Sequence, residues 1–172
     1  AFMPVVGRGA RADEPVIYFT WEGYNDPKFF PAYMEKNGAP PEMPIFGDVE
    51  EALQKVSAGF VVDVVHPCSG DPRRWRLNDL LAPIDTGRLS NWPDVFDELK
   101  TVNGINADGK QWFVPFDWGQ TSFTYRPDLV DLEGQEESWS LLWDERYKGK
   151  LGSMAAAEDA WYCAAIYAGL DI

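Results

Sequence analysis

Two short apolar runs limit the folds that this chain can adopt. VIYFT at residues 16–20 and FVVDVV at residues 60–65 are rich in β-branched and aromatic residues, which favour strands. The second run is apolar on both sides, as strands buried in a parallel sheet are. Parallel strands need a crossover connection, so the two runs predict an α/β fold with helices between its strands.

The segment between the two runs carries local signals for helices. Residues 25–27 (NDP) place a capping side chain before a proline at the first helical position, and Gly38 is expected to end that helix. A short strand is expected at residues 43–46, and Asp48 then caps an amphipathic helix at residues 49–59. Sheets of this kind bind ligands at the C-terminal ends of their strands.

The pattern changes in the second half of the chain. Asp108-Gly109 is a hairpin signal, and a β-rich stretch is expected from Gln111 to Arg126. We therefore divide the chain into a first α/β lobe at residues 13–115, a crossover or hinge strand at residues 116–126, and the start of a second lobe at residues 127–172.

The first twelve residues point to secretion. Ala10-Arg11-Ala12 is an A-x-A pattern directly before the acidic Asp13 and Glu14, which is typical of a secretory cleavage site. Residues 1–12 are then the remnant of a signal peptide, and the mature protein is expected to be secreted and soluble; the resemblance given below implies the periplasm. A disordered N-terminal extension explains the same residues, and both interpretations stay open.

Charge excludes one class of partner. The chain has 28 acidic residues against 15 Lys and Arg, a net charge of −13. Nucleic-acid binding depends on clusters of Lys and Arg, so we expect no nucleic-acid partner. The same charge suits a cationic ligand, although an acidic surface also serves solubility alone.

The residues with reactive side chains form no enzyme motif. HPCSG at residues 66–70 lacks the Glu and the second Cys of a zinc deaminase site. His66 is the only histidine, and it lies too close to Cys68 to be the distant base of a thiol protease. One histidine with Cys68 and Cys163 makes a poor metal site. We expect no enzyme, no metal and no cofactor; pairing of the two cysteines stays open.

Five stretches, in this order and spacing, resemble the periplasmic spermidine/putrescine-binding proteins of bacterial ABC importers. They are YFTWEGY, DVVHP with its following loop, LLAPIDTGRLSNW, FVPFDWGQTSFTY and SWSLLWDERYKGKLG. The resemblance implies a periplasmic-binding-protein-like fold of two α/β lobes, joined by crossover strands, that closes on its ligand. Family members are much longer than this chain, so the resemblance implies an N-terminal half: one lobe, the crossover and the start of the second lobe.

The resemblance also implies a function. It is that of an extracytoplasmic solute-binding component that delivers a polyamine, or a similar small cationic amine, to an ABC permease. In the family, aromatic rings and carboxylates surround the polyamine. Carried across, the rings that hold the alkyl-ammonium chain fall on Trp21 and Tyr24, with Glu22 where the family commonly has a small hydroxyl residue. Asn25 follows as a further polar candidate.

Other ligand positions of the family match less well. The family has a serine and a tyrosine after the strand that corresponds to residues 60–65, and these positions fall on Cys68 and Gly70 here. A pair of acids in the second lobe falls on Ala156 and Asp159. Asp117 either faces the cleft or braces the hinge, and the exact amine stays open. The candidate ligand residues are Trp21, Glu22, Tyr24, Asn25, Cys68, Ser69, Asp117 and Asp159.

An alternative function uses the same residue types. Tryptophan platforms and acids also serve extracytoplasmic carbohydrate-binding proteins and hydrolases, although no acid pair here has a supporting motif. Amine binding weakens with ionic strength, whereas carbohydrate binding does not. Half of a cleft is expected to bind poorly. Tight binding by this chain alone would indicate either that it dimerises or that the half-chain interpretation is wrong.

Overall fold

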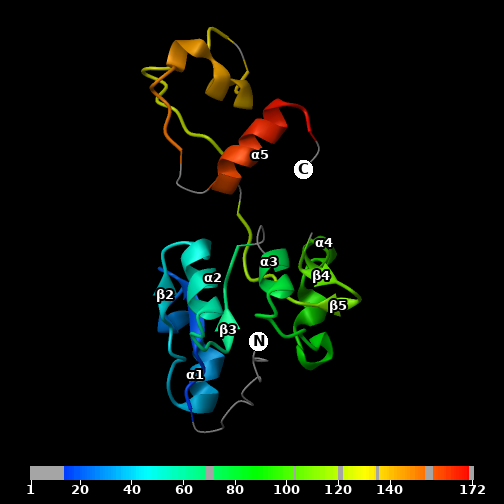
Figure 1. Cartoon of the computed structure of the whole chain (residues 1–172). Coiled ribbons are helices and arrows are strands. Elements are labelled where there is room, and N and C mark those ends of the chain that lie inside the picture. Colours follow the sequence, from blue (N-terminus) through cyan, green and yellow to red (C-terminus); the bar gives the residue numbers. More distant parts are fainter. Residues whose placement is uncertain are drawn as a thin grey trace. The chain divides into compact units, whose positions relative to one another are not determined.

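Three short strands form a parallel sheet in the first part of the chain. The computed structural model describes residues 14–68, 72–102, 104–119, 122–134, 136–153 and 157–170. Strand β1 (Tyr18–Trp21) lies between β2 (Ile45–Phe46) and β3 (Val64–Val65) and pairs with both in parallel (Figure 1). The protein therefore mixes helices with small sheets, which is compatible with the predicted α/β fold.

The register of the strands brings their C-terminal ends to one edge of the sheet. Trp21, the last residue of β1, aligns with Phe46, the last residue of β2. Phe19 aligns with Val65 at the end of β3. Because side chains alternate along a strand, Phe19 and Trp21 point to one face of the sheet and Tyr18 points to the other. The segments after all three strands therefore leave the sheet at the same edge.

A 3₁₀ turn and an α-helix connect β1 to β2. Asp26 caps η1 (Pro27–Phe29), and α1 (Pro31–Asn37) follows after Phe30. Gly38 ends α1 with a φ of 77°, a left-handed conformation that glycine adopts without steric cost. The helix predicted after residues 25–27 is confirmed, with a break at Phe30 because the proline that follows disfavours helical geometry in the residue before it.

Helix α2 (Val49–Ser57) connects β2 to β3. Its N-cap is Asp48, as predicted, and the Asp48 carboxylate accepts a hydrogen bond of 2.8 Å from the Glu51 N–H. Ala52 and Leu53 are buried on the side of α2 that faces the sheet. The cap therefore fixes where the helix begins, and the buried residues fix which face packs on the strands.

The hydrophobic core lies between the sheet, α2 and α3 (Pro72–Leu77). Phe19 and Phe46 meet edge to face, with ring centroids 4.8 Å apart, and Trp75 of α3 is fully buried. Partly buried side chains, among them Trp21 and Phe113, pack around this group. The buried core cluster consists of Phe19, Phe46, Ala52, Leu53 and Trp75.

The prediction that the second apolar run is buried on both sides is wrong. Only Val64–Val65 of this run forms a strand, and the Val61 and Val64 side chains are 56% and 49% exposed. The reason is the position of β3, which is the edge strand of the described sheet. A parallel strand is covered on both faces only where the sheet continues and helices flank it.

A hairpin forms the second small sheet. Strands β4 (Asn106–Ala107) and β5 (Lys110–Gln111) are antiparallel, and the turn between them is the predicted Asp108-Gly109. These two residues have φ values of 56° and 70°, both positive, as a two-residue hairpin turn requires. The elements that precede the hairpin are η2 (Thr86–Arg88), η3 (Trp92–Asp94) and α4 (Asp97–Lys100).

The β-rich stretch expected from Gln111 to Arg126 is wrong beyond the hairpin. Residues 112–119 and 122–126, the described part of that stretch, contain no strand. A run with strand propensity becomes a strand only beside a pairing partner, and the described residues provide none there.

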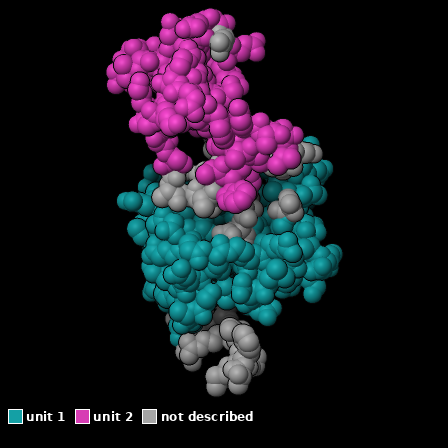
Figure 2. Space-filling model, turned by 45° about the horizontal axis from the view of Figure 1, so that its top comes forward, with its two compact units in different colours: residues 1–116 teal, residues 117–172 magenta. Residues whose placement is uncertain are grey.

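The chain divides into two compact units, residues 1–116 and 117–172 (Figure 2). Unit 2 contains the 3₁₀ helices η4 (Trp139–Trp143) and η5 (Glu145–Tyr147) and the helix α5 (Ala157–Tyr167). That the units correspond to the lobes of a hinged protein stays a prediction. Among the helices of the described residues, none combines the length and apolarity that a membrane span requires.

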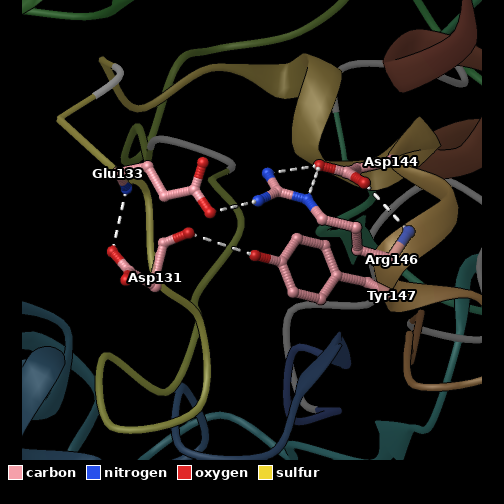
Figure 3. A network of polar contacts seen from close by, with 5 residues as sticks. All are labelled: Asp131, Glu133, Asp144, Arg146 and Tyr147. Carbon is pink, nitrogen blue, oxygen red and sulfur yellow. Dashed lines mark hydrogen bonds and ion pairs between the residues drawn. The ribbon is translucent and has the colours of Figure 1, made fainter.

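A polar network organises the loops of unit 2 (Figure 3). The Arg146 guanidinium contacts the Asp144 carboxylate at 2.7 and 2.8 Å and the Glu133 carboxylate at 3.5 Å. The hydrogen bond from Arg146 holds the pKa of Asp144 below its usual range. The Tyr147 hydroxyl donates to the Asp131 carbonyl at 3.4 Å. The Asp144 and Glu133 carboxylates pair with Arg146, and the Asp131 carboxylate accepts a hydrogen bond of 2.8 Å from the Glu133 N–H, so this network serves the fold of unit 2.

We expect Asp48→Ala to lower the free energy of unfolding by about 1 kcal/mol, because the N–H groups at the start of α2 lose their capping acceptor. Urea titration followed by tryptophan fluorescence measures this change, since Trp75 is buried against α2. Asp48→Asn keeps a capping oxygen and is the matched control. Equal stability of Asp48→Ala and the wild type would show that this cap does not stabilise α2.

Candidate functional site

The C-terminal edge of the sheet is hollowed beside Trp21. The hollow has a volume of about 390 Å³. It lies where β1 and β2 end and α2 begins, so residues from three elements meet there. The residues that line it are Trp21, Glu22, Ile45, Phe46, Gly47 and Glu51. We refer to it below as the Trp21 hollow.

The Trp21 ring belongs both to the core and to this hollow. It is half-buried and meets the Phe46 ring edge to face, with centroids 4.5 Å apart and an interplanar angle of 62°. This packing holds the indole in place while part of it faces the hollow. A ring fixed in this way can contact a ligand without first having to be ordered.

Glu22 follows Trp21 on a tight turn. The Tyr24 N–H donates to the Trp21 carbonyl at 3.2 Å, and Gly23 has a φ of 89°, which few residues other than glycine adopt. The Glu22 side chain is exposed and lines the hollow. Asn25 braces the same turn, because its Oδ1 accepts a hydrogen bond of 3.1 Å from the Gly23 N–H.

Glu51 is the second carboxylate of the hollow. Its Oε2 accepts a hydrogen bond of 2.7 Å from the Gly47 N–H, and its Oε1 lies 2.6 Å from Lys55 Nζ. The Lys55 hydrogen bond first, and the Gly47 hydrogen bond second, hold the pKa of Glu51 below its ordinary value of 4.5. Glu51 is therefore ionised at neutral pH, and two carboxylates, Glu22 and Glu51, line the hollow together with Trp21.

Sequence reasoning missed Glu51 as a site residue. The signal was present, because an acid three residues after the N-cap Asp48 is a capping-box pattern in which the acid reaches back to the helix start. The start of α2 lies directly after the end of β2, at the edge where ligands bind in such sheets. A capping acid at that point therefore faces the same edge as Trp21.

Tyr24 lies in different surroundings from Trp21. Its ring meets His66 at 4.9 Å and Phe116 at 5.9 Å, both edge to face. His66 Nδ1 in turn lies 3.1 Å from the Tyr18 hydroxyl and 3.0 Å from Thr20 Oγ1. The structure does not bring Trp21 and Tyr24 into one hollow, so a sandwich of the ligand between their rings stays a prediction.

A second hollow, of about 260 Å³, lies on the Tyr18 side of the sheet. Among the residues that the structure describes, none with a carboxylate lines it, so those residues offer rings and aliphatic groups but no counter-charge for a cation. Phe116 lines this hollow, and His66 lies next to Tyr18. Sequence reasoning did not identify either of them as a ligand residue. The lining residues are Val16, Tyr18, Phe30, Tyr33, Pro41, Val64 and Phe116.

The remaining sequence candidates lie at other points of the chain. Cys68 is exposed after β3, and Asp117 is exposed at the first position of unit 2. Ser69 lies outside the described residues. Asp159 belongs to α5, but its side chain is outside the description. Within the described ranges, no group of three or more His, Cys, Asp or Glu side chains could hold a metal ion.

Comparison with known proteins gives a limited similarity. Over 151 residues the chain is 24% identical to a protein of Pseudomonas aeruginosa named putrescine/agmatine-binding protein. The similarity covers 85% of this chain and 41% of that relative, so the chain spans about two-fifths of the relative's length. No family model matches the chain. The similarity weakly supports the resemblance to polyamine-binding proteins.

The lowered pKa of Glu51 predicts how the stability of this edge depends on pH. Its ion pair with Lys55 stabilises the fold above pH 4.5 and is lost as the pH falls through the lowered pKa. We expect Glu51→Gln to lower the urea midpoint slightly at pH 7, and the gap to the wild type to narrow as the pH falls below 4.5. Glu35→Gln, on the exposed surface of α1, is the control. A gap that stays constant as the pH falls would contradict this role.

Proposed function

We propose that this chain binds a polyamine, or a similar small cationic amine, as part of an extracytoplasmic solute-binding protein that delivers its ligand to an ABC permease. The observation that carries the proposal is the Trp21 hollow, where one indole ring and two carboxylates, Glu22 and Glu51, surround the same space. The hollow lies at the C-terminal edge of a parallel sheet, where such sheets bind ligands.

The chemistry of the Trp21 hollow suits an ammonium group. A cation over an indole face gains about 0.5–1 kcal/mol at an exposed site and about 2 kcal/mol where water is excluded. Carboxylates add charge-assisted hydrogen bonds, which are stronger than neutral ones. The volume of about 390 Å³ falls in the range of small-molecule sites, about 300–1,000 Å³. The net charge of −13 attracts cations toward the protein as a whole.

The relative supports the same ligand class. Its name states that it binds putrescine and agmatine, which are both small cationic amines. The chain spans about two-fifths of that protein. We therefore also propose, and do not take from the relative, that the protein serves an importer, docks on a permease, lies in the periplasm and binds spermidine. The two-lobe closure belongs to the proposal as well. Tyr24, Asn25, Cys68, Ser69, Asp117 and Asp159 remain proposed contacts of the bound amine.

Calorimetric titration tests the proposal, using the longest chain that the gene encodes. The ligands are putrescine, agmatine, spermidine, a quaternary ammonium compound and a neutral sugar. We expect micromolar or tighter binding of an amine that weakens as ionic strength rises, because the contact is between opposite charges. Binding of the sugar alone, unaffected by salt, would favour the carbohydrate alternative. The absence of amine binding would overturn the proposal.

We expect Trp21→Ala to weaken amine binding by about 1–2 kcal/mol, the scale of a partly desolvated cation–π contact. Trp21→Phe keeps a ring against Phe46 and should lose less. Trp92→Ala is the matched control, because Trp92 is also half-buried in unit 1 but lies outside the Trp21 hollow. An unchanged dissociation constant in Trp21→Ala would remove Trp21 from the site.

A further inference from the structure

Lys55 of α2 occupies a position like that of a bound amine. Its Nζ lies 2.6 Å from Glu51 Oε1 and 5.8 Å from the centroid of the Phe19 ring. An ammonium group of the chain is thus already held by a carboxylate and an aromatic ring beside the Trp21 hollow. These are the two kinds of contact that an alkylamine ligand would make there.

The two carboxylates of the hollow differ in what they already bind. Both oxygens of Glu51 have partners, the Gly47 N–H and Lys55 Nζ. Glu22 makes no hydrogen bond or ion pair with any residue that the structure describes. Taken together, the two lining carboxylates and the Lys55 ammonium group carry a single net negative charge. Glu22 is therefore the carboxylate left for a ligand.

We propose that Lys55 determines the specificity of the Trp21 hollow: by neutralising Glu51, it restricts the hollow to one cationic end group, held by Trp21 and Glu22. This inference rests on the proposed function. The ligand class follows from it. The group that enters is a single alkylammonium or guanidinium end, and a second positive charge close to the first has no carboxylate of its own.

The Lys55–Glu51 pair can be removed without endangering the fold. The two side chains are 47% and 39% exposed and lie four residues apart on a helix, and such pairs contribute little to stability. The charge of Lys55 has a larger effect on the affinity for a charged ligand nearby than the ion pair has on stability. Two unit charges a few ångströms apart near a protein surface interact strongly enough to change affinity about three- to tenfold at low salt.

The test compares Lys55→Gln with Lys36→Gln. Both changes remove one positive charge, but Lys36 lies on the exposed surface of α1, outside the hollow. The ligands are propylamine and 1,3-diaminopropane, which carries a second ammonium group three carbons from the first. We expect Lys55→Gln to bind both amines about three- to tenfold more tightly at low salt, with the larger gain for the diamine. The salt dependence should steepen, and Lys36→Gln should stay within about twofold of the wild type.

The outcomes separate this inference from the proposed function. One outcome is that amines bind, that Trp21→Ala weakens their binding, and that Lys55→Gln leaves it unchanged. The proposed function then stands and the role of Lys55 is overturned. The same holds if Lys36→Gln changes affinity as much as Lys55→Gln, because the effect is then one of net charge. If neither the wild type nor Lys55→Gln binds any amine, both proposals fail.

Discussion

The burial of Phe19 in the central strand is the contact on which the rest of unit 1 depends. Its ring is 1% exposed and meets the rings of Phe46 and Phe60 edge to face at 4.8 and 5.2 Å. It thereby joins β1 to β2 and to the segment that leads into β3. Because side chains alternate along β1, fixing Phe19 in the core also fixes Trp21 on the same face, at the end of the strand. The Trp21 hollow follows from this alternation.

The start of α2 decides the electrostatics of that hollow. Asp48 caps the helix, and Glu51 reaches back to the Gly47 N–H, so a structural device also places a carboxylate beside Trp21. Lys55, one turn further along, then partly cancels its charge. Helix capping and ligand recognition are therefore not separable at this point of the chain, and a change made for one alters the other.

Features that depend on neighbours in sequence could be predicted, whereas those that depend on distant partners could not. The caps at Asp26 and Asp48 and the Asp108-Gly109 turn are local, and the structure contains all three. The exposure of Val64 depends on whether the sheet continues beyond β3, which no local pattern encodes. At the site, the sequence predicted that Trp21 lies at the end of a strand. That Glu51 lies near it depends on the register of β1 with β2, which the sequence does not show.

The imidazole of His66 can serve as an NMR probe of the C-terminal edge of the sheet. It is the only histidine of the 172 residues, so its imidazole proton signals in an NMR spectrum need no assignment by mutagenesis. The ring centroids of Tyr18, Tyr24 and Phe116 lie 6.2, 4.9 and 5.1 Å from that of His66, close enough for their ring currents to displace those signals. Any rearrangement after β1 or β3 would therefore change the chemical shift of a single, isolated resonance.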